Sequence, residues 1–553
     1  MKRGIEEDYI IDYNAGHITF TPKRLITKDS RIIIEFEYAD QNYLRSMYAV
    51  NLDYQQGDKF RMYLNVFSQQ DGKKPVEDEF SPVESLALQN AGDNPLNSVV
   101  SSIAPVDDFS AFRVLYEVRD SMGFDSVLVY SNDDEAQLFS AFFSFVGAGN
   151  GDYVIDPTVA ANGRVYRWIA PEIMGDSVIH FGEYAPVRQL VSPKQQQLYT
   201  FGAEYQISKK SKVKAEIGLS NNDLNRLSNL DENDNLGIAA YTEFENDFEF
   251  GKKDEWKLET DVSYEFVGDR FQPLNPYRNA EFQRDWNIQS NQKVTEHIGR
   301  GGFQLRHKTK GNLAYQFSGF LRDSLYEGGK HFAQYVLNRK GYEILLQGNL
   351  LNADALNEKS QFSRPKFNIG IPIFRDSTGQ KYWKIGAYGE REKNERFSKK
   401  NAEVSDTLSL NSFWYDLYRI YLESPESQKI RFGLKYQNRK DYAPLNTDFE
   451  QSTNADELSI TGNWNGRWKA GKKERRNNIR LGWNFTYRQL EIKDETLTNQ
   501  EPAETFLGKL NYGLTLVNGV FQTNTNYEIG SGQERKSEFV FLPVQPGEGN
   551  FVW

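Results

Sequence analysis

Apolar and polar side chains alternate along most of the chain between residues 198 and 530. In the first such segment Tyr199 and Phe201 alternate with Thr200. A period of two places one face of an extended strand in apolar surroundings and the other in polar ones. We count sixteen such segments in this region, and consecutive ones follow each other as hairpins. Several run for about ten residues or more, which suits a tilted membrane-crossing strand better than a globular one of roughly five to six residues.

The connectors between these segments alternate between short and long. Short links include Lys308–Asn312, Arg339–Gly341 and Val517–Gly519. The long connectors are rich in Asn, Asp, Ser and Glu, and they cover residues 220–236, 267–302, 351–365, 391–411, 438–456 and 490–504. Outer-membrane barrels show this asymmetry, with short periplasmic turns and long external loops. The alternation therefore predicts that the long connectors all lie on one side of the sheet.

These patterns predict an all-β fold, an antiparallel transmembrane-type β-barrel of about 16–18 strands or a part of a larger one. Aromatic residues placed near strand ends, such as Trp256 and Phe266 or Trp483 and Tyr487, are expected to form interfacial girdles. The apolar faces are nearly free of Lys and Arg, and Arg419 is the exception. The alternative is a soluble or surface-tethered β-rich adhesin without a pore, because alternation also describes soluble sheets.

The chain is expected to divide into five parts. These are a small β-module at 1–42, a first barrel hairpin at 43–67, an inserted extracellular β-rich module at 68–197, the main barrel region at 198–530, and the start of a further module or a truncated end at 531–553. Within the insert, Ser81 and Glu84 have the spacing of a capping box, and Pro82 stands at the first helical position. A short helix is therefore expected at 82–91.

Two short motifs recur along the chain. Asp8–Asp12 recurs as Asp152–Asp156, and Gly149–Val154 recurs as Gly547–Val552. When strand directions are counted from the short turns, residues 1–40, 68–197 and 530–553 all fall on the long-loop side. Trp553 supplies a terminal aromatic residue, but nearby prolines and glycines interrupt a closing strand, which favours a chain cut inside a longer protein.

The run from Asp8 to Thr21 reads Asp-Tyr-Ile-Ile-Asp-Tyr-Asn-Ala-Gly-His-Ile-Thr-Phe-Thr. It resembles a module of uncharacterised large outer-membrane and cell-surface β-barrel proteins of Bacteroidetes-type bacteria. The segments Leu219–Leu230 and Arg278–Asn287 are similar in style to barrel proteins of that group. The resemblance implies a location, and it assigns no functional residue.

Composition narrows the classes of function. With 66 Lys and Arg against 77 Asp and Glu, the net charge of -11 makes nucleic acid an improbable partner. The absence of Cys excludes disulfides, thiol catalysis and Cys-based metal sites. No apolar run approaches the roughly 18 residues of a transmembrane helix. The mean hydropathy of -0.68 still agrees with a barrel, because only alternate residues of a barrel strand face lipid. No apolar signal-peptide core follows Met1.

No constellation of residues predicts catalysis. The five His residues, at 17, 180, 297, 307 and 331, form no metal-spaced pair, and no Gly-x-Ser-x-Gly motif occurs. Asp231–Asn235 loosely resembles a calcium loop but lacks its Gly and distant Glu, so we favour a solvated loop. Gly299–Gly302 lacks the Lys-Ser/Thr of a phosphate loop and is expected to be a flexible connector. We expect a protein that is not an enzyme, with no catalytic, cofactor-binding or metal-binding residues.

One connector gathers charged and aromatic residues that suit ligand recognition. Aromatic faces and guanidinium groups together bind carbohydrate or peptide. The candidate contact residues are Arg270, Tyr277, Arg278, Arg284 and Trp286. The alternative, which we favour, is a loop packed on itself and held by ion pairs.

The sequence therefore predicts a passive protein of the bacterial outer membrane. It would act as a channel, receptor or translocon-like scaffold, with its long loops and modules extracellular. Its expected partners are outer-membrane lipid and a polysaccharide, peptide or partner surface protein, and nucleic acid is not among them.

Overall fold

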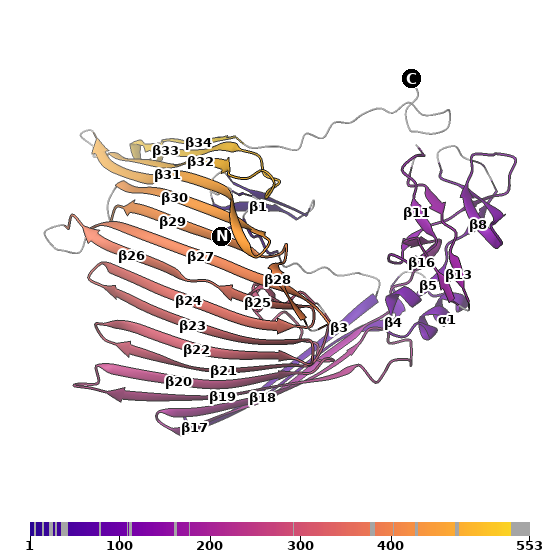
Figure 1. Cartoon of the computed structure of the whole chain (residues 1–553), viewed down its shortest axis with the longest axis horizontal. Helices are drawn as coiled ribbons and strands as arrows, with labels where there is room; N and C mark the ends of the chain where they lie inside the picture. The colour runs from indigo at the N-terminus through magenta and orange to yellow at the C-terminus, as the bar shows by residue number, and fades with distance from the viewer. Residues whose placement is uncertain are drawn as a thin grey trace.

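The computed structural model shows an all-β protein (Figure 1). It describes residues 1–531 except 5–6, 14–15, 22–25, 28–29, 35–42, 77–78, 108, 110–112, 160–162, 176, 291, 376–381, 402, 426–429 and 471–474. In these residues two α-helices occur, α1 (Pro82–Asn90) and α2 (Phe282–Asp285). None of the described helices is long and apolar enough to cross a membrane. The expected module at 531–553 lies almost wholly outside the described residues.

One large antiparallel sheet dominates the fold. Its strands are β3 (Tyr43–Gln56), β4 (Phe60–Pro75), β17 (Gln195–Ser208), β18 (Ser211–Asp223), β19 (Leu236–Phe250), β20 (Trp256–Val267), β21 (Glu296–His307), β22 (Gly311–Arg322), β23 (Tyr326–Arg339), β24 (Tyr342–Ala355), β25 (Glu358–Ser363), β26 (Lys366–Ile373), β27 (Trp383–Lys400), β28 (Glu403–Leu408), β29 (Phe413–Glu423), β30 (Ile430–Leu445), β31 (Asp448–Ala470), β32 (Arg475–Ile492), β33 (Ala503–Leu516) and β34 (Phe521–Gly530). β25 with β26, and β28 with β29, each make one interrupted pass beside β27. The described sheet therefore makes eighteen passes, which agrees with the predicted strand number.

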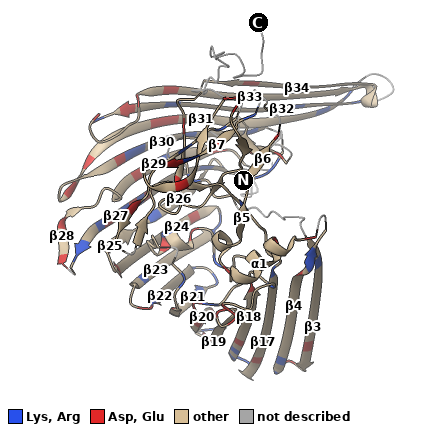
Figure 2. Cartoon of the chain, turned by 90° about the vertical axis from the view of Figure 1, so that its right-hand side faces the viewer, with Lys and Arg blue, Asp and Glu red and all other residues tan. Residues whose placement is uncertain are grey.

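The order of strands in the sheet follows the order of the chain. Each pass pairs antiparallel with the next, and β4 pairs with β17 across the inserted module. Within the described residues, β3 pairs only with β4 and β34 pairs only with β33. The sheet is strongly curved, and these two strands form its edges (Figure 2).

Connectors differ between the two ends of the strands. At one end the turns are short, as at residues 209–210 and 340–341. At the other end lie the loops 224–235, 268–295 and 493–502, together with the module inserted between β4 and β17. The predicted asymmetry of the connectors is confirmed for these loops.

Three of the predicted long loops are instead strands. Residues 351–365 are largely the end of β24 and the whole of β25, and 391–411 are largely the end of β27 and the whole of β28. Residues 438–456 belong to β30 and β31, which meet at a turn of Asn446 and Thr447. Charged residues occupy both faces of 391–400 and 438–445, so these two stretches show no apolar alternation although the ladder of backbone hydrogen bonds continues. The sheet therefore extends well beyond its apolar part on this side.

Two other predictions also require correction. Gly299–Gly302 is not a flexible connector, because it lies inside β21 and pairs with β20 and β22. Arg419 is not an exception on the apolar face, because its side chain lies on the polar face beside Tyr388 and Gln437. The hairpin expected at 43–67 extends to Pro75, and the insert covers residues 76–194.

Apolar side chains of the sheet point away from its concave side and stay exposed. Phe201 pairs with Ile217, and both are about half exposed. Val262 and Ile420 are exposed by 61% and 60%. A soluble protein normally buries such a face against another layer. No second layer covers this face in the described residues. We call the exposed apolar face of the sheet the outer belt.

The belt ends where the strands extend toward the long-loop side. On β29 the outward positions change from Ile420 and Tyr418 to Asp416. The Arg391 guanidinium pairs with both carboxylate oxygens of Asp416, at 2.6 and 2.9 Å, and covers the Trp414 ring at 4.8 Å. Charged pairs of this kind are expected in water or at a polar interface, not in hydrocarbon. The outer surface is therefore divided into an apolar and a polar zone.

Aromatic residues mark the opposite end of the belt, near the short turns. Phe250 and Trp256 stack with ring centroids 6.2 Å apart, and Lys310 lies 5.4 Å from the Trp256 ring. The rings of Trp383 on β27 and Phe432 on β30 lie 6.3 Å apart, although β29 pairs between these two strands. The predicted placement of Trp256 near a strand end is thus confirmed, whereas Trp483 lies in the middle of β32.

The inserted module contains short strands and helix α1. Its strands are β5 (Val99–Ser101), β6 (Ala104–Val106), β7 (Tyr116–Ser121), β8 (Phe124–Tyr130), β9 (Leu138–Ser140), β10 (Ser144–Phe145), β11 (Tyr153–Ile155), β12 (Tyr166–Trp168), β13 (Glu172–Met174), β14 (Ser177–Ile179), β15 (Tyr184–Ala185) and β16 (Val187–Gln189). Tyr116, Leu128, Phe143 and Tyr153 form its core. The helix begins with the predicted capping box, in which Ser81 and Glu84 bond reciprocally.

The N-terminal segment forms a hairpin of β1 (Tyr9–Asp12) and β2 (His17–Phe20). Asp8, directly before β1, lines one hollow together with inward-facing residues of the large sheet, which places this segment on the concave side. Only part of residues 1–42 is described, so the predicted module is seen as this hairpin and the segments around it.

Candidate functional site

The concave face of the sheet carries the polar side chains. Alternate residues that oppose the outer belt line a hollow of about 880 Å³. Its charged and aromatic lining residues are Asp8, Glu343, Lys384, Tyr388, Arg419, Tyr421, Glu423, Lys435 and Glu457. Because the polar face is turned inward and the apolar face outward, the sheet has the reverse arrangement of a soluble β-protein.

Opposite charges in this hollow pair across neighbouring strands. The Lys384 ammonium lies 2.8 Å from Glu343, and the Lys435 ammonium lies 2.6 Å from Glu457. Arg419 donates to the side-chain oxygen of Gln437 at 2.8 Å. The paired charges make the lining of the hollow hydrophilic, with groups of both charges, which suits a polar solute or an extended polypeptide better than an apolar ligand.

Loop 268–295 folds inward and packs on the concave face. Its Trp286 is 2% exposed and packs in a cluster with Ile298, Phe320 and Phe362 of the sheet. The Tyr326 hydroxyl donates to the backbone oxygen of Trp286 at 2.5 Å. Burial of an indole in such a cluster contributes several kcal/mol, so the loop is a fixed part of the interior.

Ion pairs also hold the middle of this loop in place. Arg278 pairs with Glu265 at 2.8 Å and also with Glu296. Near the helix α2, Arg364 donates to Asp285 at 2.6 Å. Each carboxylate or guanidinium involved is largely buried, so the loss of one partner would leave the other charge uncompensated.

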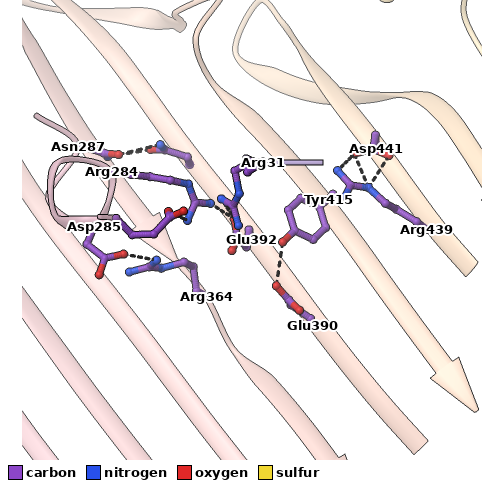
Figure 3. A network of polar contacts seen from close by, with 12 residues as sticks. Arg31, Arg284, Asp285, Asn287, Arg364, Glu390, Glu392, Tyr415, Arg439 and Asp441 are labelled. Carbon is purple, nitrogen blue, oxygen red and sulfur yellow. Dashed lines mark hydrogen bonds and ion pairs between the residues drawn. The ribbon is translucent and has the colours of Figure 1, made fainter. Parts of the chain in front are cut away.

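Glu392 connects three segments of the chain (Figure 3). Its carboxylate is 6% exposed and pairs with Arg284 of the inward loop. Arg31 of the N-terminal segment lies 3.5 Å from the same carboxylate. Asn287 and Asn394 exchange two side-chain hydrogen bonds of 2.9 Å nearby. A single residue of β27 thus anchors both segments that occupy the interior.

A second group of interior contacts lies beside Glu392. The Tyr415 hydroxyl donates to Glu390 at 2.8 Å, and the Arg439 guanidinium lies 4.1 Å from the Tyr415 ring centroid (Figure 3). Arg439 also pairs with Asp441 at 2.6 Å. These contacts extend the network across β27, β29 and β30.

The inserted module is attached to the sheet through loop 224–235. The Asn225 amide donates to the backbone oxygens of Leu88 and Gly92, each at 2.8 Å, and Asn225 is 2% exposed. The backbone oxygen of Leu88 also accepts the Ala91 N–H at the end of α1, so the Asn225 amide adds a second bond there and binds the Gly92 carbonyl just beyond the helix. The attachment places the module next to the long-loop end of the sheet (Figure 1).

The five predicted contact residues take part in internal contacts. Arg270 donates to the backbone oxygen of Asn233 at 2.6 Å, and Tyr277 lies beside Arg278. Burial raises the pKa of the Tyr277 phenol to about 12. Arg278, Arg284 and Trp286 serve the loop contacts described above. The structure therefore does not bring the five residues together as one exposed ligand surface.

Sequence reasoning missed the residues that hold the interior together. Glu392 and Asn394 fall in the stretch 391–411 that was expected to be a loop, Glu390 directly precedes it, and Arg439 falls in the expected loop 438–456. The alternation Glu390, Glu392, Asn394 is itself a period of two, but its opposite face is also charged. A pattern of polar residues at alternate positions, without apolar partners, was the signal that could have identified this strand.

In the described residues, no group of three or more His, Asp or Glu side chains is placed to hold a metal ion. Asp231, in the loop that loosely resembles a calcium site, adopts a left-handed backbone conformation with φ of 60°. The loop instead lies next to the end of helix α1.

The first 40 residues match the model of a domain of unknown function, DUF8818. No curated protein matches the chain.

Proposed function

We propose that the chain forms the membrane-spanning wall of an outer-membrane β-barrel. In this proposal the barrel acts as a channel, receptor or translocon-like scaffold. The inserted module and the long loops lie outside the cell, where they gate the barrel or recognise a polysaccharide, a peptide or a partner surface protein. The protein is passive and carries out no reaction.

The observation that carries this proposal is the exposed apolar belt on the convex face. The outward positions of β31 are apolar or glycine from Leu458 to Trp468, and Asp456 follows on the long-loop side. That stretch spans roughly 36 Å along the strand, or about 25 Å along the membrane normal for a strand tilted by about 45°. This matches the height of the apolar band of outer-membrane barrels. The aromatic residues at the short-turn end support the same placement.

The interior supports a gated passage over an open pore. Loop 268–295 and the N-terminal segment occupy the concave side, and both are fixed to Glu392. A passage with these segments in place is narrowed, and it widens if they leave. Gating by interior segments therefore requires that the contacts of Glu392 and Trp286 be released.

Two measurements on expressing cells test the proposal. The protein should sediment with outer membranes, require detergent for extraction and change its electrophoretic mobility on heating. Protease added to intact cells should cleave in residues 76–194 or 493–502, and it should spare the short turn at 209–210. A protein that stays in solution without detergent would instead be the soluble β-rich adhesin. Cleavage confined to the short turns would reverse the proposed orientation.

A further inference from the structure

In the described part of the chain, each of the two edge strands of the large sheet has a partner strand on one side only. Among the residues that the structure describes, β3 has a partner strand only in β4, and β34 has one only in β33. In Figure 2 the two strands border the opening of the curved sheet. Each edge therefore presents backbone N–H and C=O groups that the sheet itself does not pair.

Such edges are costly in a membrane. About half of the N–H groups of the 14-residue strand β3 point toward the open side. Every unpaired backbone group costs several kcal/mol in hydrocarbon, so lipid-exposed sheet edges do not occur there. This inference rests on the proposed function, because in water the same groups would be hydrated.

The two edges are complementary in direction. β3 runs toward the short turn at 57–59, and β34 starts directly after the short turn at 517–520 and runs the opposite way. A contact between them is therefore antiparallel, as in the rest of the sheet. The short turns that adjoin the two paired strands would then lie on the same side of the membrane.

The edges are also complementary in their faces. Tyr54 of β3 continues the outer face of Met62, and Phe521 of β34 continues the outer face of Leu516. Pairing Asn51 opposite Asn524, both on the inner face, sets Tyr54 opposite Phe521. The same register sets Tyr48 opposite Tyr527 and places no two like charges opposite each other. The inner pairs then include Asp53 opposite Gln522 and Asn51 opposite Asn524, whereas the outer pairs set Leu52 and Val50 opposite Thr523 and Thr525 between the two aromatic pairs.

We infer that the partner of these edges is a second copy of the chain. Two copies related by a twofold axis through the opening would each place β3 against β34 of the other. Both edges of both copies are then paired by two identical contacts, and the assembly is closed. The concave faces, with their inward loops and N-terminal hairpins, line one shared interior.

Cysteine cross-linking tests this arrangement, because the chain has no Cys of its own. Chains with Asn51→Cys and chains with Asn524→Cys are tagged differently, co-expressed, recovered by flotation with membranes and oxidised. Opposed residues of antiparallel strands lie close enough for a disulfide or a short thiol cross-linker. A covalent dimer is expected that contains both tags. Neither variant alone should give it.

The control pairs Asn51→Cys with Thr525→Cys, whose side chain lies on the other face of β34 and should cross-link at least tenfold less. Equal yields for both pairs would overturn the inference, as would a double variant that forms only an internal disulfide. Absence of any cross-link in protein that floats with membranes would also overturn it, because another strand then covers the edges. Protein that does not float with membranes would refute the proposed membrane placement, and this result is distinct from the cross-linking result.

Discussion

Arg284 and Glu392 lie 108 positions apart in the chain, and their ion pair joins the inward loop to strand β27. Arg31 approaches the same carboxylate from the N-terminal segment. The two segments in the interior therefore share one buried acidic partner, and the consequences of removing it can be measured.

Glu392→Gln should loosen loop 268–295. The amide keeps the shape of the carboxylate but leaves Arg284 with only the more distant carboxylate of Glu281, at 3.4 Å, in a site that is mostly shielded from water. We expect a loss of about 2 kcal/mol, below the roughly 3–5 kcal/mol of a fully buried pair, because Arg284 is partly exposed. Trypsin cleavage after Arg284 in detergent-solubilised protein should accelerate accordingly.

Glu395→Gln is the matched control, since Glu395 forms its ion pair with Lys393 of its own strand, at 2.9 Å, and is about a quarter exposed. Its effect should stay within about 0.5 kcal/mol. Equal cleavage rates for the two variants would show that Glu392 does not hold the loop.

Trp286→Ala should release the loop more completely. The indole is buried against Phe320 and Ile298, so its truncation costs about 3–5 kcal/mol. If the loop narrows a passage, the conductance of the purified protein in planar bilayers should rise. Leu230→Ala, at a half-exposed position of another loop, should leave the conductance unchanged. A conductance that is the same in both variants would argue against gating by this loop.

The attachment of helix α1 should depend on pH through Asp93. Burial, followed by the neighbouring Asp223 and Asp234, raises the pKa of Asp93 to about 6. The folded state therefore retains a proton that the unfolded chain releases above about pH 4, and stability falls as the pH rises from about 4 to 6. Asp93→Asn should slow hydrogen exchange in α1 at pH 7.5 and have little effect at pH 4.

Asp494→Asn provides a control of opposite sign. Hydrogen bonds from Thr496 lower the pKa of the Asp494 carboxyl, so its removal should weaken loop 493–502 at neutral pH. If both substitutions changed exchange in the same direction at pH 7.5, the account of Asp93 would be wrong.

The sequence predicted the parts of the fold that alternate between apolar and polar residues. Phe201 and Ile217 could be assigned to one face because their neighbours are polar. Glu392 could not, because charge on both faces of its strand hides the period of two. Gly299–Gly302 was misassigned for a related reason, since glycines contribute no apolar signal although they pair normally in β21.

The candidate site was less accessible to prediction. The sequence placed Arg278, Arg284 and Trp286 in one connector, but the side to which a loop folds depends on contacts with distant strands. Trp286 packs with Phe320 and Phe362 because the folded sheet places both β22 and β25 next to the loop. The sequence of the loop itself does not indicate which distant strands it contacts.

The most direct test of the membrane placement compares one lysine on each face of the sheet. Ile420 lies on the outer belt and is 60% exposed, whereas Thr461 faces the interior and lines the hollow. In lipid, Ile420→Lys should lower the free energy of unfolding by about 2–4 kcal/mol, and Thr461→Lys should change it by less than about 1 kcal/mol. Denaturant unfolding of both variants in phospholipid vesicles gives the two values. Near-zero effects of both substitutions, as at an exposed position in water, would contradict the membrane-spanning wall.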